Sequence, residues 1–280
     1  MKTILKQLMD EKYARKYLLK KRWKKYLKFC HRCRCRKLYK LSSNRYRCSR
    51  CKVEFNDFTD TFIGQLRISL TDWLLVIKLF DLEVSARRAA RETNLSYPTV
   101  YKAYMLIRMA IYLNEKNSTY FKGEIELDES YFGGRRKGKR GRGADHKVPV
   151  FGILERNGKV HVTAIKDASA ESLIGETVKK VKRGSIVYTD KWKSYDTLMF
   201  CGYRHMNVDH GERFAKGKVH INGLEGFWSF AKQRLAKFHG VSPGKFPLYL
   251  KEMEFRYNNR DEDIFEILVN YTVKLVVNRL

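Results

Sequence analysis

Three acidic residues have the types and positions that metal-assisted chemistry on phosphodiesters needs. Asp128 ends a β-like run that begins at Glu124, and Asp190 ends a second run that begins at Ile186. Glu225 follows in a helix-like segment. The formal net charge of +28 suits the chain to polyanions, yet clustered carboxylates would repel them unless cations intervened. Two Mg²⁺ ions held by acids provide that bridge in an in-line displacement at phosphorus.

The helix-like segment adds a basic residue on the face of its glutamate. Glu225, Ser229 and Lys232 are spaced by four and three residues, which places them on one side of a helix. We predict that Glu225 completes the metal site and that Lys232 holds a phosphate of the substrate. Phe227 and Trp228 are expected to pack this helix against a sheet.

The sheet itself is predicted from alternating apolar runs. Strands are expected at 124–131, 148–155, 159–166 and 185–190, with a helix at 170–181. Asn157-Gly158 favours a hairpin between the second and third strands. Three antiparallel strands, a helix and another strand describe a ribonuclease-H-like core of the α/β (α+β) class. Its first and fourth strands lie side by side, so Asp128 and Asp190 would meet.

Four cysteines in the N-terminal third have the spacing of a metal site. Cys30 and Cys33 form one Cys-x2-Cys pair, and Cys48 and Cys51 form another after 14 residues. Four thiolates at this spacing predict one structural Zn²⁺ in tetrahedral geometry, with a β-hairpin between the pairs. Cys35 could replace Cys33, so that ligand stays open.

Residues 85–108 have the pattern of a helix-turn-helix. Ser85 and Ser96 are predicted to cap two helices on either side of a turn at 93–95, and Pro98 is tolerated in a first helical turn. A helical hairpin without DNA contact is the alternative. In the DNA-reading version, the residues that face a groove are Tyr97, Thr99, Tyr101 and Lys102.

Two further segments are rich in positive charge. Residues 1–56 carry 20 Lys+Arg against three Asp+Glu, interleaved with aromatic residues, which favours contact with a phosphate backbone. Residues 133–147 carry seven Lys+Arg among glycines, which favours an arm that folds onto DNA. Six of these seven are predicted to contact DNA: Arg135, Arg136, Lys137, Lys139, Arg140 and Arg142.

Composition and pattern together predict the domain organisation. Hydrophobic residues make up 44% of the chain, which excludes a disordered basic tail, and no apolar run is long enough for a membrane span. We expect a basic helical segment at 1–25 and a zinc ribbon at 26–56. A helix-turn-helix region at 57–118 and a catalytic domain with C-terminal helices at 119–280 follow.

Taken together, the motifs resemble those of bacterial insertion-sequence transposases of the DDE class with an N-terminal zinc ribbon. The resemblance covers residues 25 to 270 and is carried by the cysteine spacing and by segments 127–134, 187–190, 220–229 and 254–258. It implies that Asp128, Asp190 and Glu225 bind the metal and that Lys232 is the basic residue after the glutamate. Because some relatives carry Asn at the third position, Asn222 is the second candidate there.

The resemblance also implies an activity and its partners. Such a protein binds the terminal inverted repeats of its own element, cleaves a strand at the end, and lets the freed 3′-hydroxyl attack target DNA. It would use two Mg²⁺ or Mn²⁺ ions per active site and one Zn²⁺. We expect double-stranded DNA as the partner, a homodimer or higher oligomer on DNA, no membrane, and a bacterial cytoplasmic, nucleoid-associated location.

Two other functions fit parts of the pattern. A non-cutting DNA-binding regulator derived from a transposase would keep the zinc module but would tolerate loss of the acids. A stand-alone ribonuclease-H-type nuclease would leave the helix-turn-helix without a task.

Near the site, Glu129 is expected on the opposite sheet face from Asp128, in an ion pair or a cap. His210 and His220 could lie near the same site, and Asp209 is a rival acid there. Trp192 and Tyr195, just after Asp190, are expected to be buried.

Overall fold

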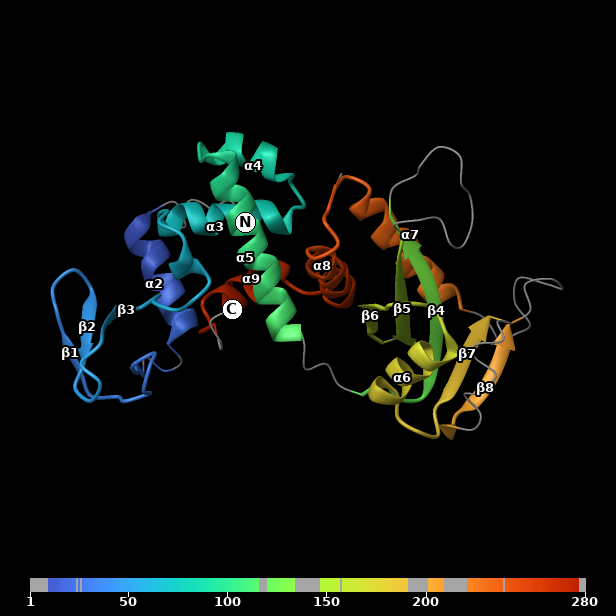
Figure 1. The fold of residues 1–280 in the computed structure, drawn as a ribbon. Coiled ribbons are helices and arrows are strands. Elements are labelled where there is room, and N and C mark those ends of the chain that lie inside the picture. Colours follow the sequence, from blue (N-terminus) through green and yellow to red (C-terminus); the bar gives the residue numbers. More distant parts are fainter. Residues whose placement is uncertain are drawn as a thin grey trace. The chain divides into compact units, whose positions relative to one another are not determined.

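The chain divides into two compact units. The computed structural model describes residues 10–23, 25, 27–115, 120–133, 147–156, 158–190, 201–208, 221–238 and 240–276. Unit 1 joins Met1–Asn114 to Asp261–Leu280, and unit 2 is Glu115–Arg260. Figure 1 labels their elements. Within the described ranges, the helices fall short of the length and apolarity that a bilayer crossing requires.

Unit 1 is mainly helical, with a small sheet near its start. Its elements are α2 (Glu11–Arg22), β1 (Leu38–Lys40), β2 (Arg45–Cys48), β3 (Glu54–Asn56), the 3₁₀ helix η2 (Ile63–Gln65), α3 (Leu70–Asp81), α4 (Ala86–Thr93), α5 (Tyr97–Glu115) and α9 (Ile264–Thr272). The strands form an antiparallel sheet in the order β1-β2-β3. The hairpin predicted between the two cysteine pairs is therefore confirmed, and a third strand extends it.

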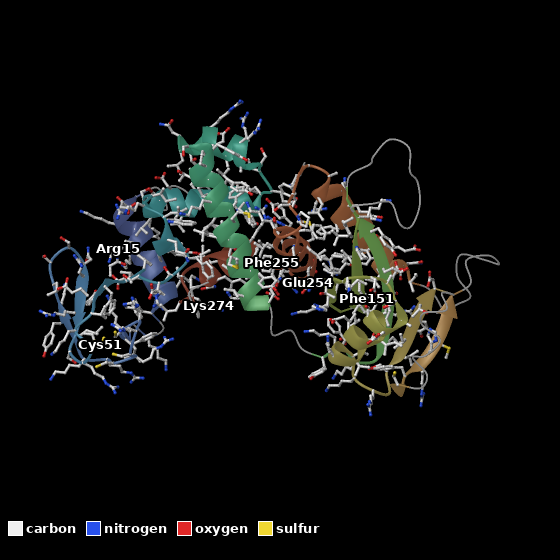
Figure 2. The ribbon with its side chains drawn as sticks, in the orientation of Figure 1. Arg15, Cys51, Phe151, Glu254, Phe255 and Lys274 are labelled. Carbon is white, nitrogen blue, oxygen red and sulfur yellow. The ribbon has the colours of Figure 1, made fainter. Side chains whose placement is uncertain are left out.

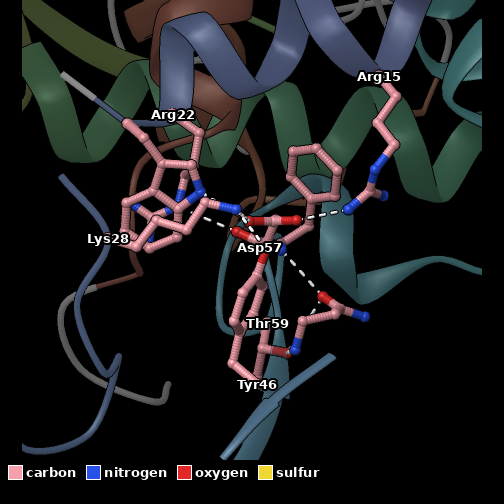
Figure 3. A network of polar contacts seen from close by, with 9 residues as sticks. Arg15, Arg22, Lys28, Tyr46, Asp57 and Thr59 are labelled. Atoms are coloured by element: carbon pink, nitrogen blue, oxygen red, sulfur yellow. Dashed lines mark hydrogen bonds and ion pairs between the residues drawn. The ribbon is translucent and has the colours of Figure 1, made fainter. Parts of the chain in front are cut away.

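A buried carboxylate ties α2 to this sheet (Figure 3). Asp57, directly after β3, pairs with Arg15 of α2 and with Lys28, whose Nζ lies 2.9 Å from Asp57 Oδ1. The indole Nε1 of Trp23 donates to the same Oδ1 at 2.8 Å. Lys28 also donates to the hydroxyl of Tyr46 on β2. One acid thus joins three segments that are far apart in the sequence.

The two helices predicted around the turn at 93–95 are present as α4 and α5. Ser85 accepts a hydrogen bond from the Arg88 amide at 3.3 Å, and Ser96 accepts one from the Thr99 amide at 3.4 Å. Between them Asn94 has φ of 55°, a left-handed conformation that ends α4 and that Asn tolerates. The local capping chemistry in the sequence was sufficient to define this motif.

The end of the chain returns to unit 1. Glu266 of α9 accepts hydrogen bonds from Tyr17 and Lys21 of α2. Beyond α9, Leu275 bridges to Thr61, and Lys274, labelled in Figure 2, donates to Asn114 at 2.6 Å. The expected 119–280 domain groups these residues with the catalytic part instead. The difference arises because these contacts join positions at opposite ends of the sequence.

Unit 2 is built around a mixed sheet. Its elements are β4 (Glu124–Phe132), β5 (Val148–Glu155), β6 (Val160–Ala164), α6 (Ala170–Lys180), β7 (Ile186–Asp190), β8 (Arg204–Val208), α7 (Asn222–Leu235) and α8 (Phe246–Asn258). The strand order is β6-β5-β4-β7-β8. β4 pairs antiparallel with β5 and parallel with β7, and β8 runs parallel to β7. This is the predicted ribonuclease-H-like arrangement, with β8 as an addition that the sequence pattern did not predict.

Helices cover both faces of this sheet (Figure 1). On one face, Leu173 of α6 packs with Leu127, Val187 and Phe151, the last labelled in Figure 2. On the other face, α7 and α8 pack against the strands; the buried residues there include Leu224, Phe227, Trp228, Leu250, Val150 and Leu154. The prediction that Phe227 and Trp228 pack the helix against the sheet is confirmed.

α8 also covers the outer edge of the sheet. Asn258 accepts a hydrogen bond from the Val160 amide and donates one to the Val160 carbonyl, both at 2.8 Å. Glu254 accepts the Val162 amide at 2.9 Å and pairs with Lys251. Because these side chains take the place of a neighbouring strand, the segment 254–258 satisfies backbone groups on β6.

Replacing Asp57 should destabilise unit 1 strongly. In Asp57→Asn, Arg15 and Lys28 lose the counter-charge of a fully buried carboxylate, a change that costs about 3–5 kcal/mol when partners are buried. We expect the lower end of this range, because both cationic side chains are 28% exposed. Chemical denaturation of the full chain measures the change.

The matched control breaks an exposed pair in the same sheet. Arg45 and Glu54 lie 3.1 Å apart with both side chains exposed, so Glu54→Gln should cost about 0–1 kcal/mol. Equal losses of stability in the two variants would contradict a central role for Asp57.

Candidate active site and zinc site

The parallel pairing of β4 with β7 determines where two of the candidate acids lie. Glu126 is opposite Tyr188 in this register, so two residues further along both strands Asp128 stands beside Asp190. Asp190 is the last residue of β7. The expectation that Asp128 ends its strand is wrong, because β4 continues to Phe132 and Asp128 lies in its middle. The parallel register nevertheless places it beside Asp190 at the end of β7.

The surroundings of Asp128 disfavour its negative charge. Burial is the largest cause and, with the charges of Glu129 and Asp190, raises the pKa of Asp128 to about 7, while a hydrogen bond from Trp228 lowers it. A divalent cation would offset both the repulsion and the lost solvation. The donor chemistry of this strand pair therefore fits Mg²⁺ or Mn²⁺, which prefer carboxylate oxygens.

The indole of Trp228 reaches the carboxylate of Asp128 from α7. Its Nε1 donates to Asp128 Oδ2 at 2.9 Å. Gly152 of β5 is the cross-strand partner of Asp128, and a Cβ at Gly152 would lie 2.7 Å from the Trp228 ring. The missing side chain at 152 thus leaves room for the ring to lie over β5.

A second acid on the same face of β4 holds the start of α7. Glu126 is buried, and its Oε2 accepts the Leu224 amide, in the first turn of α7, at 2.9 Å. No side chain at the N-cap position Ile221 caps this helix, so Glu126 satisfies an otherwise free amide. Arg156 donates to the other oxygen of Glu126 at 3.2 Å. Glu126 is engaged in structure rather than available to a ligand.

The exposed face of α7 carries the remaining candidates. Glu225, Ser229 and Lys232 are exposed, whereas Trp228 and its neighbours on the opposite side are buried, as the spacing predicted. The Lys232 ammonium lies 5.8 Å from the ring centroid of Phe132, the last residue of β4. Asn222, the second candidate for the third ligand, is exposed at the first position of α7.

The three acids do not converge on one point. Within the described ranges, the only group of three or more potential ligands whose donor atoms all lie within 4.8 Å of one another is the cysteine cluster. A site for two ions about 3.5–4 Å apart does not require such convergence, because each ion takes part of the ligand set. The assignment of Glu225 to this site stays a prediction.

The four cysteines do converge. Sγ of Cys30 lies 3.5 Å from Sγ of Cys51, and the same distance separates Cys33 from Cys48. Zn–S bonds of about 2.3 Å in a tetrahedron place sulfurs about 3.8 Å apart, so the set fits Zn²⁺. Cys35 lies outside the cluster and contacts Ser49 at 3.6 Å. The geometry favours Cys33 over Cys35.

The candidate DNA-reading residues occupy the first turns of α5. Tyr97 and Lys102 are exposed, and Thr99 and Tyr101 are half-buried. The rings of Tyr97 and Tyr101 lie 6.0 Å apart, and the guanidinium of Arg87 on α4 lies 5.8 Å from the Tyr97 ring centroid. This surface combines aromatic and cationic groups.

Several predictions concern residues outside the described ranges. These are the basic arm of Arg135, Arg136, Lys137, Lys139, Arg140 and Arg142, together with Trp192, Tyr195, Asp209, His210 and His220. Glu129 is described: it is buried, one residue from Asp128, and so on the opposite face of the strand.

Two residues of the site were missed by the sequence reasoning. Glu126 stands two positions before Asp128, and an acid at this spacing in an apolar strand indicates the same face. Gly152 inside a predicted strand indicates close approach of another group. Both signals are present in the sequence, but neither identifies the distant partner, which is Leu224 for Glu126 and Trp228 for Gly152.

Comparison with known proteins identifies the family. A model of the ISXO2-like transposase domain matches residues 120–258, and a model of the transposase zinc-ribbon domain matches residues 9–54. An uncharacterized transposase-like protein of Haemophilus influenzae is 40% identical over 103 residues, which are 37% of this chain and 84% of that protein. The chain belongs to the ISXO2-like transposase family. The resemblance seen in its motifs is thereby confirmed.

Other proteins match this chain at lower sequence identity. An uncharacterized protein of the transposable element ISH50 from Halobacterium salinarum is 28% identical over 275 residues, covering 90% of this chain and 92% of that protein. A simian T-cell lymphotropic virus intasome chain matches at 14% identity and a TM-score of 0.31, with 56% of this chain and 57% of that chain covered. The Mos1 transposase paired-end complex with left transposon end matches at 13% identity and a TM-score of 0.25, with 72% of this chain and 79% of that chain covered.

Without a divalent cation at Asp128, the stability of the protein should fall as the pH rises from about 4 to about 7. The pKa of Asp128 is about 7 in the folded protein against 3.8 ordinarily, so in this window the folded state binds more protons than the unfolded chain. Asp128→Asn removes this titration, so its stability should fall less over the same window. Denaturant unfolding across the window compares the two, and parallel curves would contradict the raised pKa.

Zinc content should separate the two rival cysteines. Cys33→Ser removes one of four converging thiols, so we expect the bound zinc to be lost, whereas Cys35→Ser should keep about one zinc per chain. Elemental analysis of the purified variants measures this ratio. Retention of zinc by Cys33→Ser together with its loss from Cys35→Ser would reverse the assignment.

Proposed function

We propose that this protein is a DNA transposase that binds the terminal inverted repeats of its own insertion sequence, cleaves a strand there and transfers it into target DNA. One observation carries the proposal: in a transposase-family chain, Asp128 in the middle of β4 lies beside Asp190 at the end of the parallel strand β7. The pKa of Asp128, raised to about 7 by burial and neighbouring acids, supports cation binding at this point.

In this proposal the acids act as metal ligands. Asp128 and Asp190 hold the ions from the sheet, and Glu225 holds them from the exposed face of α7, with Asn222 as the second candidate. Bound Mg²⁺ or Mn²⁺ supplies activation of the attacking oxygen and stabilisation of the leaving oxygen. Lys232, exposed on the same face of α7, binds a phosphate of the substrate and so helps orient the scissile bond.

Unit 1 supplies the DNA-binding surface. Tyr97, Thr99, Tyr101 and Lys102 contact the inverted repeat from α5, supported by the arginines of α4. The zinc ribbon adds phosphate contacts through its exposed cations, which include Arg32, Arg34, Lys40, Arg47 and Arg50. The basic arm at 135–142 adds further phosphate contacts.

Transfer of an element requires two ends to be joined in concert. We therefore expect at least a homodimer assembled on double-stranded DNA, acting in the cytoplasm on the nucleoid.

We assign the two functional domains to the ranges that the family models match, with the zinc ribbon at 9–54 and the transposase domain at 120–258.

Strand cleavage of a labelled duplex that carries the element's own end tests the proposal. With Mg²⁺ or Mn²⁺, the native protein should cut at the end of the element, and Asp190→Asn should bind the same DNA but not cut it. Glu171→Gln is the matched control, because Glu171 is an exposed acid at the start of α6 in the same unit. It should cut like the native protein.

The outcomes distinguish the rival functions. Tight binding of the element's end by the native protein, without cleavage under either metal, would indicate a regulator. Equal cleavage of unrelated duplexes would indicate a nuclease without end recognition. Cleavage by Asp190→Asn at the native rate would contradict the proposal that Asp190 is a metal ligand.

A further inference from the structure

The position of Trp228 is determined from several sides. Its ring packs edge-on against Phe132, with centroids 5.9 Å apart, and against Phe227, with centroids 5.2 Å apart. Across β5, the absent side chain of Gly152 leaves the space that the ring occupies. The side chain is 5% exposed, so its rotamer is fixed by packing. The direction of its N–H bond is therefore fixed as well.

That N–H bond points at one oxygen of Asp128 only. Nε1 donates to Oδ2 at 2.9 Å. A carboxylate whose Oδ2 is held in this way cannot rotate freely about its terminal bond, so Oδ1 is presented in a fixed direction. Side chains that bond a metal ligand in this way orient it and stabilise its charged form.

Packing alone does not require this bond. Trp73 of α3 is as deeply buried as Trp228, and its Nε1 has no hydrogen-bond partner within the described part of the chain. A tryptophan can therefore fill space in this fold without an acceptor. The bond to Asp128 is a specific feature of the site.

We propose that Trp228 is a positioning residue that orients the carboxylate of Asp128 for metal binding, with Gly152 providing the space that the ring needs. This inference rests on the proposed function, in which Asp128 is a metal ligand. Loss of a group that positions a ligand typically lowers metal affinity about 10-fold to 100-fold, whereas loss of the ligand itself removes the site.

Mn²⁺ binding to the full-length, DNA-free protein tests the inference without an activity assay. Titration calorimetry would compare four variants with the native protein. Trp228→Phe keeps an aromatic ring but lacks the donor, and Gly152→Ala keeps the donor but displaces the ring, since the added Cβ would lie 2.7 Å from it. Trp73→Phe is the matched control, and Asp128→Asn removes the ligand.

We expect Mn²⁺ affinity to fall about 10-fold or more in Trp228→Phe and in Gly152→Ala, and to stay native in Trp73→Phe. The two test variants disturb one contact from opposite sides, so a folding defect in one, seen by thermal unfolding, leaves the other as the test. Native affinity in the folded test variants, with binding lost in Asp128→Asn, would overturn the positioning role but leave the proposed function intact. Native Mn²⁺ binding by Asp128→Asn would instead overturn the ligand assignment itself.

Discussion

Burial of the Asp128 carboxylate beside two other acids is the physical constraint on which the arrangement of unit 2 depends. The parallel pairing of β4 with β7 brings Asp128 beside Asp190, and Glu129 adds a third charge one residue away. Burial and these charges raise the pKa of Asp128 to about 7, which works against a fully ionised site in the absence of a cation. The net charge of +28 does little to favour ionisation of Asp128, because distant charges are screened by salt. Burial at the site itself has the larger effect on the pKa. The site is thus built to take up positive charge.

The helix that carries Glu225, the proposed third ligand, is held to the same strand. Glu126 accepts the Leu224 amide, and the indole of Trp228 donates to Asp128, so two acids on one face of β4 hold two successive turns of α7. Gly223 and Gly152 both lie where a Cβ would meet these contacts, at 2.8 Å from Glu126 and 2.7 Å from Trp228. Close approach of helix and sheet at these points requires glycine. The exposed face of α7, with Glu225 and Lys232, is oriented as a result.

Local patterns in the sequence predicted local structure well. Residue alternation predicted four of the strands, the serine caps predicted α4 and α5, and the cysteine spacing predicted the cluster that the structure brings together. Contacts between distant positions were not predictable from these patterns. Glu126 and Leu224 are 98 residues apart, and the return of α9 to unit 1 joins the two ends of the chain. In both cases the sequence pattern indicates that a strand or helix has a face to bury. Which distant segment packs against that face is determined by the fold.

The central claim is that Asp128, Asp190 and Glu225 hold divalent cations between β4, β7 and α7. The most direct measurement replaces Mg²⁺ with Fe²⁺ and maps where the radicals formed at the bound ion cut the protein backbone. We expect cuts in the middle of β4, at the end of β7 and in the first turn of α7, all weakening as Mg²⁺ is added back. Cuts that are confined to other elements, such as the cysteine cluster, or that Mg²⁺ does not suppress, would contradict the claim.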